Sequence, residues 1–445
     1  MHLYTDVREI ILFATSIASQ MSGTGGLQAM IGESVQQLVL PGSCVDTYYA
    51  GVSNVEKQCF PSRVQNKFYI NLNSTSSGSE SVLLFNPNQG VTDIVLELQL
   101  PDLSAYTTLA LNQGWGYRMI NNLSFRFASA PQYFVQGEQH FISAMEACEN
   151  GTKRDQLVQL GGQALLTAAD FADPVKRTAY VYIKIPSNSP KANKPLPYPS
   201  DITTQPLQLS IQLQNWASVF LNSSTIPSSA QSFSKARVNF RQVELNNSSD
   251  LLAQRENMSE KMYIYPLDRF EQRQVTLPLL GNGQQQSVQL TGFRSGEIKS
   301  IVLWAVDNGD IDQTTPTANW FNYLPLQNVV LTVNGDVRYD GRDGSPAMWD
   351  LVTNTSSSSW NNLVVTSGTP NTAASTTGYW TRIPMGQEAS VLGNEFELTH
   401  GYSVMNSVLN LQVQLPANAN GYTLYATYWY SACLSFHAGQ VDYIF

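Results

Sequence analysis

The sequence predicts an antiparallel all-β protein that contains two copies of one domain, and three observations support this fold class. Apolar and polar residues alternate with a period of two, which is the pattern of half-buried strands. Gly, Asn, Pro and Ser interrupt the alternating runs at short intervals, as in proteins of many short strands. Strand patterns of the first half recur in the same order in the second half. A chain of 445 residues also exceeds the usual size of one hydrophobic core, which favours two domains.

The first 54 residues precede the strand patterns and form a predicted N-terminal arm. Its apolar run "EIILFATSIA" faintly resembles a signal peptide, but Asp6 and Glu9 and the short apolar core weaken that interpretation. We expect an amphipathic arm or helix that docks on a neighbouring subunit or on the underside of a larger assembly. Its candidate assembly residues are Ile10, Ile11, Leu12 and Phe13.

Alternating strands begin in the predicted first domain, residues 55–245. The stretch "DIVLELQLP" places Ile94, Leu96, Leu98 and Leu100 on one face, and "NLSFRF" does the same with Leu123, Phe125 and Phe127. A short segment around "AM" at Met145 is expected to be a helical turn. The domain closes on "SFSKARVNFRQVEL", after a Pro-rich loop at residues 187–201.

A polar, poorly patterned linker at residues 246–262 precedes the predicted second domain, residues 263–445. This domain closes on "GYTLYATYWYSACLSF", where both faces of the strand carry large side chains, so we expect both faces to be covered. A Ser/Thr/Asn-rich loop interrupts it at residues 353–378.

Five matches between the halves keep their order and nearly their spacing, which indicates a duplication. The offset falls only from 207 to 202 residues along the pairs Phe68/Val275, Ile94/Ile301, Leu123/Val329, Met145/Met348 and Leu209/Leu411. The last pair lies in two closely similar stretches, "LQLSIQLQNW" and "LNLQVQLPAN".

The composition argues for self-association and against nucleic-acid packaging. Charged residues make up 13% of the chain, while neutral polar residues are plentiful. A neutral polar surface is inexpensive to desolvate, which suits a protein that buries its outside against copies of itself. The net charge of −9, with no basic tail, opposes direct binding of nucleic acid. No run of 18 apolar residues exists, so no transmembrane helix is expected.

Catalytic and metal-binding motifs are not found in the sequence, so we expect neither an enzyme nor a cofactor or metal. The histidines and cysteines are scattered along the chain without the spacing of metal ligands: His2, His140, His400, His437, Cys44, Cys59, Cys148 and Cys433. For the cysteines, free thiols are favoured over disulfides. Two acidic clusters could supply oxygen ligands for Ca²⁺: Asp307, Asp310 and Asp312, and Asp336, Asp340 and Asp343. We favour tight turns at both places, because turns also require Asp together with Gly and Asn.

The stretches "PLQNVVLTVNGDVRYDG" and "LNLQVQLPANANGYTLYATYWYSACLSF" carry a resemblance to a known family. The duplicated pattern, over residues 55–445, resembles the double jelly-roll major capsid proteins of icosahedral DNA viruses, the lineage of tectivirus-like phages, adenoviruses, virophages, polinton-like viruses and large eukaryotic DNA viruses. The resemblance implies two tandem eight-stranded antiparallel jelly rolls with short helical segments.

What this resemblance implies about function is a structural role in the virion capsid. The family assembles as pseudo-hexameric homotrimers, or capsomers, that tile an icosahedral shell around the genome. The implied partners are neighbouring capsomers, penton proteins, minor or cement capsid proteins and, in some members, an inner membrane, without sequence-specific binding of nucleic acid. Synthesis in the interior of the host cell is expected.

Two other functions stay open from the sequence. A tandem β-sandwich carbohydrate-binding protein would use exposed aromatic platforms, for which the candidates are Trp216, Trp320, Trp360 and Trp380. A polysaccharide-active enzyme would need two facing carboxylates, which sequence cannot exclude because they need only be close in space.

Overall fold

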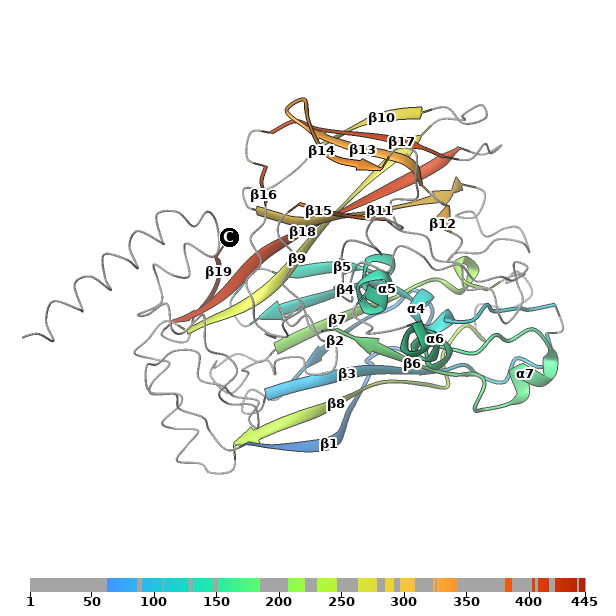
Figure 1. The fold of residues 1–445 in the computed structure, drawn as a ribbon. Coiled ribbons are helices and arrows are strands. Elements are labelled where there is room, and N and C mark those ends of the chain that lie inside the picture. Colours follow the sequence, from blue (N-terminus) through green and yellow to red (C-terminus); the bar gives the residue numbers. More distant parts are fainter. Residues whose placement is uncertain are drawn as a thin grey trace, which may run out of the picture.

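The computed structural model of the protein is shown in Figure 1. It describes residues 62–85, 90–106, 108–127, 130, 132–146, 151–184, 207–220, 230–245, 263–277, 285–291, 297–308, 323–324, 326–341, 381–385, 402–404, 407–415, 421–437 and 440–444. The arm at residues 1–54 and the linker at residues 246–262 lie outside this part of the chain.

The first half of the chain forms two antiparallel four-stranded sheets that face each other. One sheet has the order β1-β8-β3-β6, with β1 at Ser62–Asn71, β8 at Lys235–Leu245, β3 at Gly90–Gln99 and β6 at Thr178–Ile183. The other has the order β2-β7-β4-β5, with β2 at Glu80–Leu84, β7 at Leu207–Leu213, β4 at Ile120–Phe127 and β5 at Tyr133–Gln136.

The second half repeats this arrangement. Its seven-stranded sheet contains β9 (Tyr263–Leu277), β18 (Tyr422–His437), β11 (Glu297–Asp307) and β15 (Thr381–Pro384), with the additional short strands β12 (Tyr323–Leu324), β16 (Tyr402–Ser403) and β19 (Gln440–Ile444). Its four-stranded sheet has the order β10-β17-β13-β14, at Gln285–Leu290, Leu409–Gln414, Gln327–Val333 and Asp336–Gly341.

The two halves have the same topology once the short strands β12, β16 and β19 are set aside. Counted along the chain, strands one, eight, three and six form one sheet of each half, and strands two, seven, four and five form the other. This is the strand order of a jelly roll. The prediction of two tandem eight-stranded jelly rolls is therefore confirmed, and the two units are called the first and second roll below.

The duplicated pairs fall on equivalent strands. Phe68 and Val275 lie on the first strands, Ile94 and Ile301 on the third, Leu123 and Val329 on the fourth, and Leu209 and Leu411 on the seventh. Leu209 lies opposite Leu83 and Phe125, and Leu411 lies opposite Val288 and Leu331 in the same way. Met145 lies in a helix, whereas Met348 is outside the described residues.

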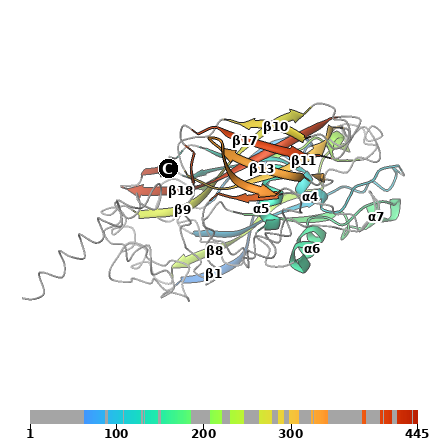
Figure 2. The ribbon, with the colours of Figure 1, turned by 45° about the horizontal axis from the view of Figure 1, so that its top comes forward.

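Short helices gather at one end of the first roll (Figure 2). They are α4 (Trp115–Arg118), α5 (Gly137–Glu146), α6 (Gly151–Leu160) and α7 (Ala168–Ala172). The expected helical turn around Met145 is longer than predicted, because it belongs to the ten-residue helix α5. Helix α7 begins with a capping box in which Thr167 and Asp170 satisfy each other's backbone N–H groups.

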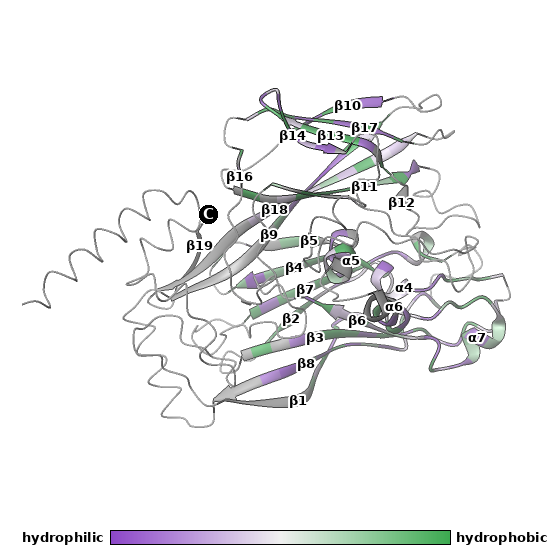
Figure 3. Cartoon of the chain, viewed as in Figure 1, coloured by the Kyte–Doolittle hydropathy of each residue, from purple (hydrophilic) through white to green (hydrophobic). Residues whose placement is uncertain are grey.

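Strand alternation builds the core of each roll, as Figure 3 shows by the alternating hydropathy along the strands. The predicted inward set of the first roll is buried: Ile94, Leu96, Leu98, Leu100, Leu123, Phe125 and Phe127. The core of the second roll includes Leu303, Leu331, Leu411 and Tyr428.

The last strand of the second roll is covered on both faces, as predicted. Leu424, Ala426 and Tyr428 point into the core of the second roll. On the other face, Tyr425 and Trp429 join the same continuous apolar cluster as the core of the first roll. This apolar cluster also includes Val302, Trp304 and Val306 of β11. The two rolls are thus held together by a buried apolar contact within one chain.

Candidate assembly surfaces

The candidate assembly residues of the arm, Ile10, Ile11, Leu12 and Phe13, lie outside the described residues. The described surfaces that could meet another molecule are the outer faces of the sheets. In Figure 1, the four main sheets succeed one another from β10-β17-β13-β14, through the β11–β18 sheet and the β2-β7-β4-β5 sheet, to β1-β8-β3-β6. The first and last of these sheets each turn one face to their own core and the other face away from the other roll.

The second-roll end face is defined here as the outer face of β10-β17-β13-β14. Its polar positions alternate with the core residues and include Gln285, Gln289, Asn410, Gln412 and Gln414. The Gln285 amide Nε2 donates to Gln412 Oε1 at 3.2 Å, and Asn328 Nδ2 donates to Gln414 Oε1. This face is rich in neutral amides that hydrogen-bond to one another across strands.

The equivalent strand of the first roll has the same character. Gln212 on β7 accepts hydrogen bonds from Asn121 Nδ2 at 3.1 Å and from Asn122 Nδ2 at 2.6 Å. The similar stretches "LQLSIQLQNW" and "LNLQVQLPAN" are therefore the seventh strands of the two rolls, each with leucines in a core and amides on an outer face.

The first-roll end face is defined as the outer face of β1-β8-β3-β6, and Glu97 lies at its centre. This carboxylate, which is 3% exposed, accepts hydrogen bonds from three side chains of β8. Lys235 Nζ lies at 2.5 Å, Arg237 Nε at 2.7 Å and Asn239 Nδ2 at 2.9 Å. Burial acts to raise the pKa of Glu97, but the hydrogen bonds from Lys235, Asn239 and Arg237 outweigh it and leave the pKa lowered.

The cationic network continues across this face. Arg237 lies over the ring of Tyr69, with its guanidinium carbon 4.8 Å from the ring centroid. Arg241 Nη1 donates to Asp93 Oδ2 at 3.1 Å, and burial raises the pKa of Asp93 even though Arg241 opposes it. The side chains of Arg241 and Asp93 are 52% and 25% exposed, so the cationic group is the one presented to solvent.

Glu97 and Arg237 occupy positions that carry a different chemistry in the second roll. Glu97 lies opposite Arg237 between β3 and β8, and Trp304 lies opposite Tyr425 between β11 and β18. The Trp304 and Tyr425 rings stack with centroids 5.3 Å apart and planes within 7°. The sequence analysis did not single out this pair, although the match of "IVLELQ" with "IVLWAV" already aligns Glu97 with Trp304.

The tryptophans proposed as carbohydrate platforms and the two acidic clusters are the remaining candidates from the sequence. Trp216, proposed as a carbohydrate platform, is fully buried between Phe220 and Phe233, so it cannot present a face to a sugar. Trp320, Trp360 and Trp380 lie outside the described residues. Val333 pairs with Asp336 across the turn Asn334–Gly335, so Asp336 lies directly after a tight turn, whereas Asp340 lies within strand β14. Asp310, Asp312 and Asp343 are outside the described part.

His140 is a core histidine on α5 and is 2% exposed. Burial lowers its pKa to about 4, and the nearby backbone of Tyr182 opposes this shift. Among the residues that the structure describes, no helix is long and apolar enough to cross a membrane. Cys433 lies on β18, whereas Cys44, Cys59 and Cys148 fall outside the described ranges.

Comparison with known proteins shows likeness in structure alone. No protein-family model and no curated protein matches the sequence. PBCV-1 VP54, as fitted into a reconstruction of the virophage Sputnik, superposes with a TM-score of 0.62 at 9% identity, covering 88% of this chain and 99% of that chain. The major capsid protein of Faustovirus gives a TM-score of 0.56 at 8% identity, over 85% of this chain and 92% of that chain. The chain therefore has the double jelly-roll fold found in these viral capsid proteins.

Proposed function

We propose that this chain is the major capsid protein of an icosahedral DNA virus and has a structural, non-enzymatic role. The observation that carries the proposal is the pair of rolls with identical topology in one chain. This arrangement superposes on nearly the full length of PBCV-1 VP54 and of the Faustovirus major capsid protein. Three such chains supply six similar rolls, so a homotrimer can occupy a pseudo-hexagonal position in a shell.

The intrachain contact between the rolls supports a rigid building unit. Trp304, Tyr425 and Trp429 are buried in an apolar cluster shared with the first roll, as in permanent interfaces. A fixed relation between two rolls is what a repeating tile requires, because the angle between neighbouring rolls sets the geometry of the assembly.

The proposal extends to partners and location. Neighbouring capsomers, penton proteins and minor or cement proteins would contact the trimer in the virion capsid, after synthesis inside the host cell. The arm at residues 1–54 would dock on a neighbouring subunit through Ile10, Ile11, Leu12 and Phe13. The net charge of −9 supports a shell that does not bind the genome directly.

Size-exclusion chromatography with light scattering tests the proposal on the purified full chain. We expect a stable species near three times 49.2 kDa, with a hexagonal outline in negative-stain electron microscopy. A monodisperse monomer at every concentration would contradict it. Turnover of a polysaccharide by the purified protein would instead support the enzymatic alternative.

A further inference from the structure

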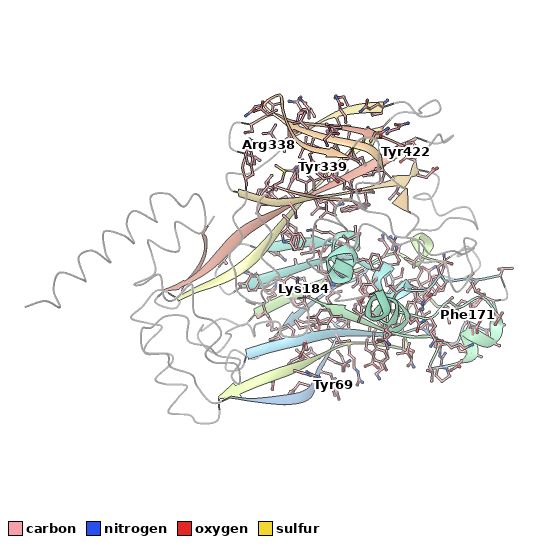
Figure 4. All side chains as sticks on the ribbon, in the orientation of Figure 1. Tyr69, Phe171, Lys184, Arg338, Tyr339 and Tyr422 are labelled. Carbon is pink, nitrogen blue, oxygen red and sulfur yellow. The ribbon has the colours of Figure 1, made fainter. Side chains whose placement is uncertain are left out.

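We propose that the contact between the two rolls contains a binding site for ordered water, formed by Gln272 of β9, Thr427 of β18 and Ser300 of β11. Figure 4 shows side chains filling the space between the second roll, on which Tyr422 is labelled, and the first roll, on which Lys184 is labelled. The site lies within one chain, so it goes beyond the capsid role and does not depend on how copies assemble.

The three residues lie on one face of the seven-stranded sheet, the face that contacts the first roll. Thr427 lies between Tyr425 and Trp429 in the alternation of β18, and both aromatic residues belong to the apolar cluster shared with the first roll. Gln272 lies directly opposite Thr427. Ser300 lies opposite Trp429, which makes it a diagonal neighbour of Thr427. Thr427 is therefore the centre of the group, with one polar neighbour on each adjoining strand.

Aromatic pairs flank this polar group along the strands. On one side, the rings of Phe270 and Trp429 have centroids 4.8 Å apart. On the other side, the stacked rings of Trp304 and Tyr425 have centroids 5.3 Å apart. The polar group is thus enclosed within an otherwise apolar contact, where an unsatisfied hydrogen-bonding group is costly.

The polar atoms of the group need partners. Thr427 is 3% exposed and Ser300 is 1% exposed. Their hydroxyl oxygens and both amide atoms of Gln272 are buried, and none of these four atoms has a hydrogen-bond partner in the part of the chain that the structure describes. Buried polar groups in folded proteins are almost always hydrogen-bonded, because an unsatisfied one loses its hydration without compensation. On the same strand, Thr423 shows the usual solution, since its Oγ1 donates to Asn308 Oδ1 at 2.7 Å.

The chemistry of the group indicates water as the ligand. Each hydroxyl can donate and accept a hydrogen bond, and the amide of Gln272 can do both. A buried water requires two to four polar partners, which these three side chains supply. None of the three side chains is charged, and a buried ion would need a paired charge, so the site favours a neutral ligand.

Apolar substitutions of similar shape distinguish a hydrated site from a dry one. With water bound, Thr427→Val alone should lower the melting temperature of the full chain by about 1–3 °C, because the water and the remaining polar groups lose a partner. In a dry site, the same substitution removes an unsatisfied hydroxyl and should raise the melting temperature. The triple variant Gln272→Leu, Thr427→Val and Ser300→Ala should return to within about 1 °C of the wild-type value, because no polar side chain of the group remains.

Thr423→Val is the matched control, because it makes the same change on the same strand at a hydroxyl with a direct partner. It should lower the melting temperature whether or not water is bound nearby. Its effect should add to that of Ser300→Ala, whereas the effects of Thr427→Val and Ser300→Ala should not add, since these two hydroxyls share the bound water.

A crystal structure or cryo-electron-microscopy map of the full chain at about 2 Å resolution tests the site directly. We expect a water peak at about 2.7–3.2 Å from Thr427 Oγ1 and from a polar atom of Gln272 or Ser300, and its loss in Thr427→Val. A direct hydrogen bond between Gln272 and Thr427 without this peak would overturn the proposal, as would a rise in melting temperature for Thr427→Val. Neither result affects the capsid proposal, which is tested by the mass of the assembled species.

Discussion

Glu97 is a buried carboxylate on a sheet face that also carries the cations Lys235, Arg237 and Arg241. Its three hydrogen-bond donors come from one strand, so the side chain ties β3 to β8 through Lys235, Arg237 and Asn239. A buried charge is tolerated only when it is paired and hydrogen-bonded. The side chains of Lys235 and Arg237 remain partly exposed, so water can replace some of their lost hydrogen bonds when the carboxylate is removed.

Replacement of this carboxylate should therefore destabilise the first roll. We expect Glu97→Ala to lower the free energy of unfolding by about 2–3 kcal/mol, because the cations lose a buried acceptor while water solvates them only in part. Urea denaturation followed by circular dichroism measures the change. Lys176→Ala is the matched control, since the Lys176 side chain that it removes is 42% exposed and its loss should cost under about 1 kcal/mol. Equal losses in the two variants would contradict the role assigned to Glu97.

His140 should make stability fall as the solution becomes acidic. Its folded pKa of about 4 lies below the ordinary value of 6.5, because burial disfavours the charged ring. The unfolded chain therefore binds more protons between these two values, and stability decreases as the pH falls from 6.5 toward 4. We expect a contribution of roughly 3 kcal/mol across this window.

Melting curves collected across that pH window test the histidine directly. His140→Gln removes the titrating ring, so the variant should lose less stability than the wild-type chain on acidification. The carboxylates that titrate in the same direction, such as Asp170, are present in both proteins and are thus controlled for. Parallel curves for the two proteins would show that another group dominates.

At the scale of single elements, two glycines have different physical requirements. Gly335 forms the turn between β13 and β14 with a φ of 91°, and a Cβ placed there would meet nothing within 4 Å. Gly116 of α4 has no such backbone strain. A Cβ at Gly116 would instead lie 2.5 Å from the Gly161 carbonyl oxygen and 2.7 Å from Ala179 Cβ.

Alanine should consequently cost more in the helix than in the turn. We expect Gly335→Ala to destabilise by about 1 kcal/mol, which is the backbone cost of a left-handed conformation. Gly116→Ala should cost about 2–3 kcal/mol, because α4 must move away from β6 and the Gly161 backbone to relieve the clash. Thermal unfolding of both variants measures the difference, and the reverse order would contradict the packing described for α4.

The whole molecule depends on the apolar contact between the rolls. Trp304 and Leu303 are adjacent on β11 but point to opposite sides. Trp304 joins the cluster shared with the first roll, whereas Leu303 belongs to the core of the second roll. This arrangement allows coupling between rolls to be separated from stability within one roll.

Truncation of Trp304 should uncouple the rolls. We expect Trp304→Ala to lower the free energy of unfolding by about 3–5 kcal/mol, because Trp304 is the largest side chain that β11 contributes to the cluster shared by the two rolls. The calorimetric unfolding peak should split in two, because the rolls then unfold separately. Leu303→Ala should lower the transition temperature of the second roll through a cavity in its own core, without removing the contact between rolls. A single unshifted transition for Trp304→Ala would contradict the coupling.

The sequence by itself determined the alternating strands and the duplication, because a period of two is a local property that fixes which side chains face a core, whereas the two jelly rolls were predicted only through the resemblance to a known family. Equivalent residues such as Leu209 and Leu411 could be matched for the same reason. The length of α5, the burial of Trp216 and the joining of β11 and β18 to the first roll were decided only by the tertiary structure. These features depend on which surfaces meet over long distances in the chain, and an alternating pattern is the same whether an outward side chain meets water, a charged neighbour or another sheet.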